Sequence, residues 1–324
     1  MRVRPWIAGL PITLLLGLCG AARAQDANVL LPADSAEFLM AYGAFQLPES
    51  LIPMRPAELI EHDRTQRAGL WYEDGTGVLV QWAPAPKRGE AFNNVPRYEV
   101  GAYELQKLYL DEPEYVVPPT ALRMIPLEWY RTMDADVERT FDVGASVLVV
   151  LQYFLFSTKE DDVFDEGRFA TDTTYARYWA NANLFTYLID HKDANRGNLR
   201  ISTIEGHPRV FVVDNGVAFG SEPSNRGTRW SELQVDRFPF RTVLGLRTLT
   251  REGLQRALGV LAQWELRGGE LVRVQPTVNW RPRRGIRRRD DGVQIGLTEA
   301  EIDDVWNRIE GFLARVDRGW IEVF

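Results

Sequence analysis

Cysteine and histidine are scarce in this chain of 324 residues, which has one cysteine, Cys19, and three histidines. Cys19 lies in an apolar N-terminal stretch with the marks of a removable leader, so the mature chain would contain no disulfide and no reactive thiol. Three scattered histidines are too few for a histidine-based zinc site. These two shortages exclude a disulfide scaffold, thiol catalysis and histidine–zinc chemistry.

An excess of basic residues is also missing, because 38 Lys and Arg face 45 Asp and Glu and give a formal charge of −7. Loss of the three arginines in the leader would lower this charge to about −10. An acidic chain is a poor candidate for nucleic-acid binding, so we expect no nucleic-acid partner. The basic run Arg281–Asp291 contains proline and glycine, which favours a solvated loop; a site for an anionic partner is the alternative.

The N-terminus has the three parts of a secretory signal peptide. A basic start, the apolar run Leu10–Leu18 and the small-x-small sequence Ala22–Ala24 follow one another. The pattern predicts a signal peptide over residues 1–24 and an exported protein, periplasmic or extracellular. The apolar run is short for a membrane span, so we expect no span in the mature chain; an uncleaved anchor is the alternative. Residues 25–324 are enough for one large domain with two lobes.

Strand-like segments dominate the first half. The segment Gly69–Trp82 is two strand-like runs around Asp74–Gly75, which predicts a tight hairpin. The alternative to the hairpin is a glycine-rich loop over phosphates, for which the Gly-x-Gly in this segment is only a weak signal. Helical spacing predicts an amphipathic helix over Arg97–Leu110, and the apolar, β-branched stretch Val143–Phe156 predicts a buried strand.

The second half has mainly helical periodicity. We expect helices over Tyr175–Ile189, Arg251–Leu266 and Glu301–Val316, the last preceded by a capping-box pattern at Thr298–Glu301. A short buried strand is expected over Arg209–Val213. The chain is therefore predicted to be an α+β protein whose strand-rich and helical lobes enclose a cleft.

One motif follows the helix over Tyr175–Ile189. The sequence HKDANRGN (His191–Asn198) has the Asp-to-Asn spacing of the protein-kinase catalytic loop H-R-D-x-x-x-x-N, and Asp214–Gly216 (DNG) closes the next strand, as a metal-binding Asp-x-Gly does. Phosphoryl transfer needs a carboxylate for the attacking hydroxyl and hard oxygen ligands for a divalent metal. Asp193, Asn198 and Asp214 provide these groups; an ordinary surface turn is the alternative.

These segments resemble the atypical kinases of the secretory pathway and the type II phosphatidylinositol 4-kinases. The similarity is in HKDANRGN and VVDNGVAFG, and also in RYEVGAYELQKLYL followed by VVPPT. It covers about residues 69–220. The resemblance implies a bilobal protein-kinase-like fold, with an N-lobe over about 25–152 and a C-lobe over about 153–324.

The resemblance also implies residue roles and cofactors. It implies ATP or another nucleoside triphosphate with Mg²⁺ or Mn²⁺. The implied roles are catalytic base for Asp193, metal ligands for Asn198 and Asp214, partner of the phosphate-binding lysine for Glu99, a backbone contact to adenine for Tyr153, and support of the loop for His191 and Gly216. An exposed helix charge at Glu99 and a core side chain at Tyr153 are the alternatives.

The sequence departs from the family pattern at the phosphate-binding lysine. Gln81 occupies the matching position, and a neutral amide donates hydrogen bonds without offsetting phosphate charge. Lys87 or Arg88 follows a few residues later and is a candidate substitute, with a solvated loop charge as the alternative for Lys87.

Three functions are compatible with these residues. The first is an exported kinase-like phosphotransferase that moves a phosphoryl group from a nucleoside triphosphate to a hydroxyl acceptor on a protein, a lipid or a sugar. The second is a pseudokinase that acts as a binding module, which Gln81 favours. The third is a structural or interaction protein whose turn only mimics the motif.

Overall fold

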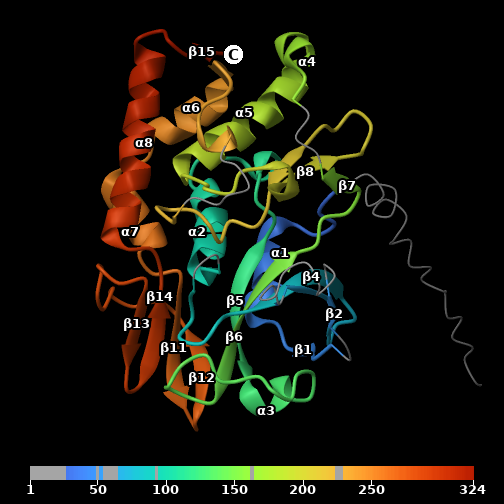
Figure 1. Cartoon of the computed structure of the whole chain (residues 1–324), viewed down its shortest axis with the longest axis vertical. Helices are drawn as coiled ribbons and strands as arrows, with labels where there is room; N and C mark the ends of the chain where they lie inside the picture. The colour runs from blue at the N-terminus through green and yellow to red at the C-terminus, as the bar shows by residue number, and fades with distance from the viewer. Residues whose placement is uncertain (1–26, 49–50, 54–64, 92–93, 161–163, 223–228) are drawn as a thin grey trace, which may run out of the picture.

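The computed structural model describes residues 27–48, 51–53, 65–91, 94–160, 164–222 and 229–324 (Figure 1). The predicted signal peptide lies outside the described residues. No helix among the described residues is both long and apolar enough to cross a bilayer. The strands of the first half and the long helices of the second half gather at opposite ends of the molecule (Figure 1), which confirms the predicted α+β class.

A six-stranded antiparallel sheet forms the strand-rich end, in the order β1-β3-β4-β6-β5 with β2 paired to β3. Its strands are β1 (Phe45–Gln46), β2 (Ile52–Pro53), β3 (Gln66–Tyr72), β4 (Gly77–Pro84), β5 (Thr120–Pro126) and β6 (Ser146–Tyr153). The turn between β3 and β4 contains Gly75 at φ 84° and confirms the hairpin that Asp74–Gly75 predicts. Strand β6 is buried throughout, as its apolar sequence predicts.

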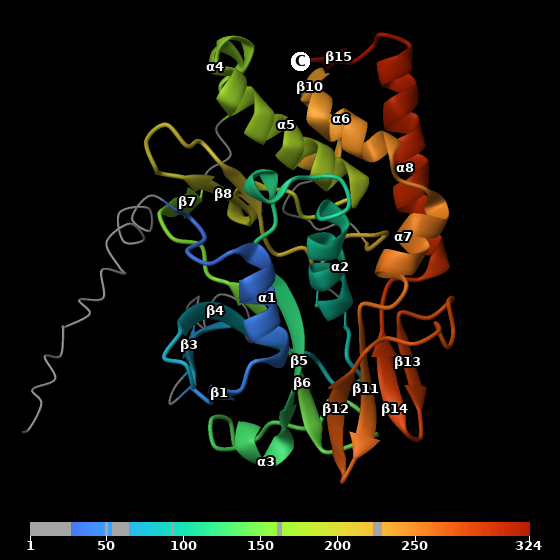
Figure 2. The ribbon, with the colours of Figure 1, turned by 180° about the vertical axis from the view of Figure 1, so that it is seen from behind.

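The two faces of this sheet are covered by different helices. Side chains alternate along β4, so Val78, Val80 and Trp82 pack in a core with α1 (Ala33–Tyr42), which lies in front of the sheet in Figure 2. The small helix α3 (Leu127–Tyr130) closes the same core. The opposite face contacts helix α2 (Pro96–Gln106). Gln81 lies on this opposite face.

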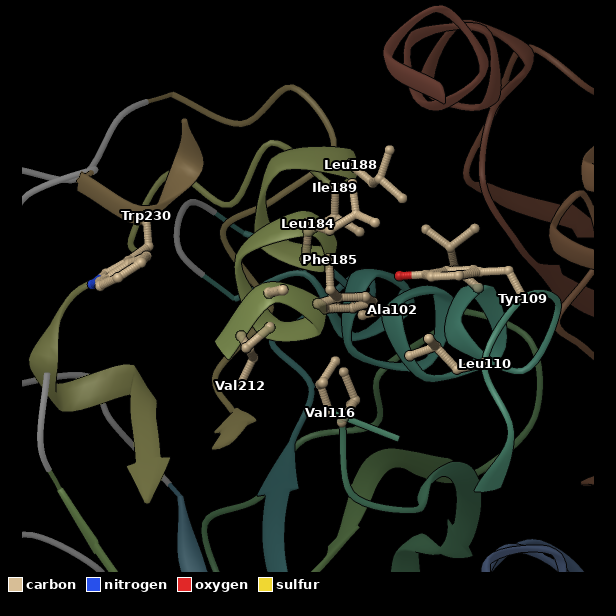
Figure 3. Close-up of a cluster of buried hydrophobic side chains, with 14 of the residues drawn as sticks. Ala102, Tyr109, Leu110, Val116, Leu184, Phe185, Leu188, Ile189, Val212 and Trp230 are labelled. Carbon is tan, nitrogen blue, oxygen red and sulfur yellow. The ribbon is translucent and has the colours of Figure 1, made fainter. Parts of the chain in front are cut away.

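Helices α2 and α5 join the two ends of the molecule through one core (Figure 3). Ala102 of α2 lies beside Phe185 of α5 in this cluster, and Val116 and Val212 lie below them. The remaining elements of this end are the 3-10 helices Glu112–Glu114, Arg196–Asn198 and Arg229–Ser231, strands β7 (Thr158–Glu160), β8 (Leu199–Ser202), β9 (Val210–Val212), β10 (Arg237–Phe238) and β15 (Glu322–Val323), and helices α4 (Glu166–Thr171), α5 (Thr173–Leu188), α6 (Phe240–Arg247), α7 (Arg251–Leu258) and α8 (Glu299–Asp317).

The predicted capping box is present and has a second use. Thr298 Oγ1 accepts from the Glu301 amide, and Glu301 Oε2 accepts from the Thr298 amide. The same carboxylate forms an ion pair with the buried Arg97 of α2, at 2.5 Å from its Nη1. Glu301 therefore starts α8 and fixes the N-terminal end of α2 against it.

The predicted helix over residues 251–266 is wrong in its second half. Helix α7 ends at Leu258, and residues 262–295 form a four-stranded sheet in the order β12-β11-β14-β13. Gly268–Gly269 is the turn between the first two strands of this sheet, β11 and β12. Both glycines have positive φ, as a two-residue hairpin turn requires. The strands are β11 (Ala262–Arg267), β12 (Glu270–Val274), β13 (Ile286–Arg289) and β14 (Gly292–Ile295). Alternating apolar residues let this sheet pack against β5 and β6 of the first sheet.

The predicted solvated loop at Arg281–Asp291 is also wrong in part, because Ile286–Arg289 is strand β13. The side chain of Arg287 is buried and donates to three backbone carbonyls, those of Gly259, Arg281 and Leu297. Burial lowers the pKa of Arg287 to about 10. Arginine can occupy this position because its guanidinium provides five donors in a fixed geometry.

We predict that Arg287→Met lowers the free energy of unfolding by about 3 kcal/mol or more, because buried carbonyls lose charge-assisted hydrogen bonds. Arg288→Met, on an exposed position of the same strand, is the matched control and should change stability by less than about 0.5 kcal/mol. Urea unfolding of both variants measures this. Equal losses would contradict a structural role specific to Arg287.

Candidate active site

The predicted catalytic loop follows directly from α5. Asp190, just after the helix, has φ 50°, and this left-handed turn sends the chain back across the helix end. The amide of Lys192 donates to Val217 O, and the amide of Phe219 donates to Ile189 O. The loop and the segment after Asp214 therefore run side by side.

Asp193 is held in place by two asparagine side chains. Asn195 Nδ2 donates to Asp193 Oδ1 at 2.8 Å, and Asn198 Nδ2 donates to Asp193 Oδ2 at 2.9 Å. Asn195 Oδ1 accepts from the Gly197 amide, which closes a tight turn inside the loop. Both carboxylate oxygens of Asp193 thus have fixed directions.

The hairpin of β8 and β9 brings Asn198 and Asp214 together. Leu199 is paired with Val212 across the hairpin, and the Val213 amide donates to Asn198 O at 3.0 Å. Asp214 comes next and is exposed, with φ 60°. A left-handed backbone at an aspartate is uncommon and strained, and such strain is concentrated at functional sites. Asp193 and Asn198 are therefore hydrogen-bonded to each other, and Asn198 is bonded to Val213, the residue before Asp214.

His191 is buried and braces the loop. Its Nδ1 accepts from the Asp193 amide at 3.2 Å, and Ser231 Oγ donates to its backbone carbonyl at 2.5 Å. Burial lowers the pKa of His191 to about 4. The nearby Asp193 carboxylate raises this pKa but offsets only part of the effect of burial. The imidazole is therefore neutral at pH 7.

Glu99 of α2 reaches the segment after Asp214. Its Oε1 accepts from the Gly216 amide at 2.8 Å, and its Oε2 is buried, although the residue as a whole is half-buried. Burial first, and then the nearby Asp214 carboxylate, raise the pKa of Glu99 to about 8. No cation among the described residues pairs with Glu99, so this helix glutamate binds a backbone amide in place of a lysine.

Gln81 lies in a polar row across the sheet, on the face that contacts α2. The strand register pairs it with Arg67 of β3 on one side and with Gln152 of β6 on the other, and Gln152 is paired with Thr120 of β5. Cross-strand partners share a face and lie about 5 Å apart at Cβ. The position expected for the phosphate-binding lysine is thus neutral, with an arginine beside it.

Two other predicted nucleotide contacts lie apart from the catalytic loop. Lys87 forms an exposed ion pair with Glu138 at 2.9 Å. The side chain of Tyr153 is buried in the core beside α1, and its hydroxyl accepts from the Leu30 amide. The amide of Tyr153 donates to Pro119 O. A role in nucleotide binding stays a prediction for both residues.

The oxygen atoms at Asn198 and Asp214 fit a magnesium or manganese ion. Asn198 is buried and its Nδ2 donates to Asp193, so Oδ1 is its remaining side-chain atom for a metal, while Asp214 is exposed. Mg²⁺ is commonly bound by one or two carboxylates together with substrate phosphates. Within the described ranges, no group of three or more His, Cys, Asp or Glu side chains is placed to hold a metal by itself.

Sequence reasoning missed three residues that shape the loop: Asn195, Ser231 and Asp190. Asn195 could have been found, because an asparagine two residues after Asp193 is a common turn former. Ser231 is distant in sequence and gave no signal. Asp190 forms ion pairs with Lys192 at 2.8 Å and with Arg308 of α8 at 2.9 Å.

We predict that acid destabilises the protein through His191. A pKa of about 4 in the folded state, below the ordinary value of 6.5, means that the unfolded chain binds the proton more tightly. The contribution of the neutral His191 to the free energy of unfolding is therefore complete above pH 6.5 and is lost as the pH falls through 4. Between pH 7 and pH 5 we expect a loss on the order of 2 kcal/mol that is absent in His191→Gln.

Urea unfolding at both pH values measures this loss, and the exposed His207 provides the matched control. His207→Gln should keep the wild-type dependence. The same dependence in His191→Gln would contradict the assignment.

A second prediction concerns Glu99. Glu99→Ala leaves the Gly216 amide without its buried acceptor and should cost about 1–3 kcal/mol in the free energy of unfolding. Glu99→Gln keeps an acceptor oxygen and should lose much less. Thermal unfolding of the two variants compares them, and equal losses would show that the bond to Gly216 is not what Glu99 contributes.

Comparisons with known proteins support the fold. No known family model matches the chain, and no curated protein matches its sequence. Among solved structures, it is similar to hydra Fam20 determined with a sugar, with a TM-score of 0.54 and 12% sequence identity over 94% of this chain and 95% of that chain. The prediction of a fold like that of the secretory-pathway kinases is confirmed, and the chain has a mixed α+β fold that resembles the kinase-like fold of Fam20.

Proposed function

We propose that this protein is a metal-dependent phosphotransferase that moves the terminal phosphoryl group of a nucleoside triphosphate to a hydroxyl acceptor. The observation that carries the proposal is the hydrogen-bonded unit of Asp193, Asn198 and the strand end before Asp214. The similarity of the fold to that of Fam20 supports the proposal. A mere surface turn does not need a buried carboxylate held by two amides.

Asp193 is the proposed catalytic base. Its carboxylate accepts the proton of the acceptor hydroxyl as the oxygen forms a bond to the terminal phosphorus, and the bond from that phosphorus to the bridging oxygen breaks. The electron pair of the broken bond leaves with the nucleoside diphosphate. Asn195 and Asn198 orient the carboxylate for this step.

Asn198 and Asp214 are the proposed ligands of Mg²⁺ or Mn²⁺. These two side chains would hold the ion, which would supply positive charge to offset that of the phosphates. The neutral His191 holds the loop backbone, and Gly216 connects the Asp214 segment to Glu99. Export to a periplasmic or extracellular site, which residues 1–24 predict, is part of the proposal.

The acceptor is proposed to be a hydroxyl of a protein, a lipid or a sugar. A sugar is the first acceptor to test, since the similar Fam20 structure was determined with one. A free sugar hydroxyl is a weak nucleophile, which is the situation in which a positioned carboxylate base contributes most.

A pseudokinase that binds without transfer is the second candidate. Two observations favour it: Gln81 gives no positive charge, and Glu99 has a raised pKa and no cationic partner among the described residues. In an active kinase, a lysine paired with this glutamate is part of the working site.

We predict that Asp193→Asn reduces phosphoryl transfer at least about 100-fold, because a general base contributes that much or more. The assay follows labelled terminal phosphate from ATP to a panel of sugars and proteins with Mg²⁺ or Mn²⁺. Asp304→Asn, on an exposed position of α8, is the matched control and should transfer as the wild type does.

Unchanged transfer in Asp193→Asn would remove Asp193 from the mechanism. Tight nucleotide binding by a wild type that transfers to no acceptor and hydrolyses no ATP would favour the pseudokinase.

A further inference from the structure

The four strands β3, β4, β6 and β5 carry a single charged residue on the face that contacts α2. That residue is Arg67, and it lies beside Gln81 in the register of β3 and β4. Its neighbours Ala68 and Leu70 point into the core under α1, which places Arg67 on the other face. Arg123 of β5 points toward α1 and donates to Met40 O and Gly43 O.

Arg67 is not engaged in a strong interaction. Among the described residues it has no ion pair and no side-chain hydrogen bond, and its guanidinium lies over the ring of Phe154 at 5.7 Å. Such a half-exposed cation–π contact is worth about 0.5–1 kcal/mol, so it is easily exchanged for a stronger one. Phe154 follows β6 directly, and its amide donates to Leu79 O of β4.

Two other cations near this end of the molecule are already paired. Lys87 is bound to Glu138 on the surface, and Arg97 is bound to Glu90 and Glu301. Arg88 lies in the turn after β4, where its amide donates to Thr140 O, away from Gln81. Arg67 lies beside Gln81 and has no ion pair among the described residues, so it is placed to meet a polyphosphate. Arginine binds phosphate through two parallel hydrogen bonds, which lysine cannot do.

We propose that Arg67 is the phosphate-binding cation of this site, supplied by strand β3 in place of the lysine that is missing from β4. Cross-strand partners lie about 5 Å apart at Cβ, and an arginine side chain is long enough to cover the position to which Gln81 points. Gln81 then donates an amide hydrogen bond beside the guanidinium. This inference rests on the proposed function, because it places a nucleotide on this face of the sheet.

Binding of ATP and of adenosine, measured by calorimetry with Mg²⁺ or Mn²⁺, tests the inference. Arg67→Gln should weaken ATP binding about 10- to 100-fold, which corresponds to one or two charge-assisted hydrogen bonds, and should leave adenosine binding unchanged. Arg67→Lys keeps the charge and should lose less. The matched control Arg241→Gln removes an exposed arginine that is paired with Asp111 and should bind both ligands as the wild type does.

The outcomes separate this inference from the proposed function. ATP binding by the wild type and equally tight binding by Arg67→Gln would overturn the role of Arg67 and leave the phosphotransferase intact. Loss of ATP binding in Lys87→Gln with full binding in Arg67→Gln would assign the cation to Lys87. A wild type that binds neither ATP nor adenosine would overturn both. Thermal unfolding of each variant shows that the fold is kept.

Discussion

The hydrogen bond from the Gly216 amide to Glu99 is the interaction on which the candidate site depends, because it joins helix α2 to the segment after Asp214, which runs beside the catalytic loop. It is effective because α2 is fixed at both ends. Arg97 is paired with Glu301 of α8 at one end, and at the other end the side chain of Gln106 bonds the backbone of Val116 and Val117. Because both ends of α2 are held, the position of Glu99 is fixed, and the segment after Asp214 is bound to Glu99 through Gly216.

A second constraint is the register of two hairpins. In the hairpin of β8 and β9, the pairing places Asn198, which precedes β8, next to the residue before Asp214, which follows β9. The two proposed metal ligands therefore flank the same end of the hairpin. In the hairpin of β3 and β4, the pairing places Arg67 beside Gln81. A slip of one residue in either hairpin would move these side chains to the other face. The chemistry of the site therefore depends on backbone pairing that is set far from the reacting groups.

The fold class and the local motif of the candidate site are visible in the sequence, whereas several elements around the motif are not. The loop at His191–Asn198 has fixed spacing and local turn chemistry, and the capping box at Thr298 is also local, so both are visible in a single chain. Residues 262–266 of strand β11 were predicted as helix because a short apolar run suits either structure, and the signal for a strand was the Gly268–Gly269 turn that follows. Three features could not be predicted because they depend on contacts between residues far apart in the sequence. They are the burial of Arg287, the hydrogen bond of Glu99 to the Gly216 amide, and the pairing of Arg67 with Gln81.

The central claim is that Asp214 and Asn198 bind a metal–nucleotide complex, and thermal unfolding with and without manganese and ATP tests it most directly. At about 100 times its dissociation constant the ligand adds about 2.7 kcal/mol to the stability of the folded state, which raises the melting temperature of a chain this size by a few degrees. We expect this rise in the wild type and in the exposed control Asp304→Ala, and none in Asp214→Ala. No rise in the wild type, or an equal rise in Asp214→Ala, would contradict the account.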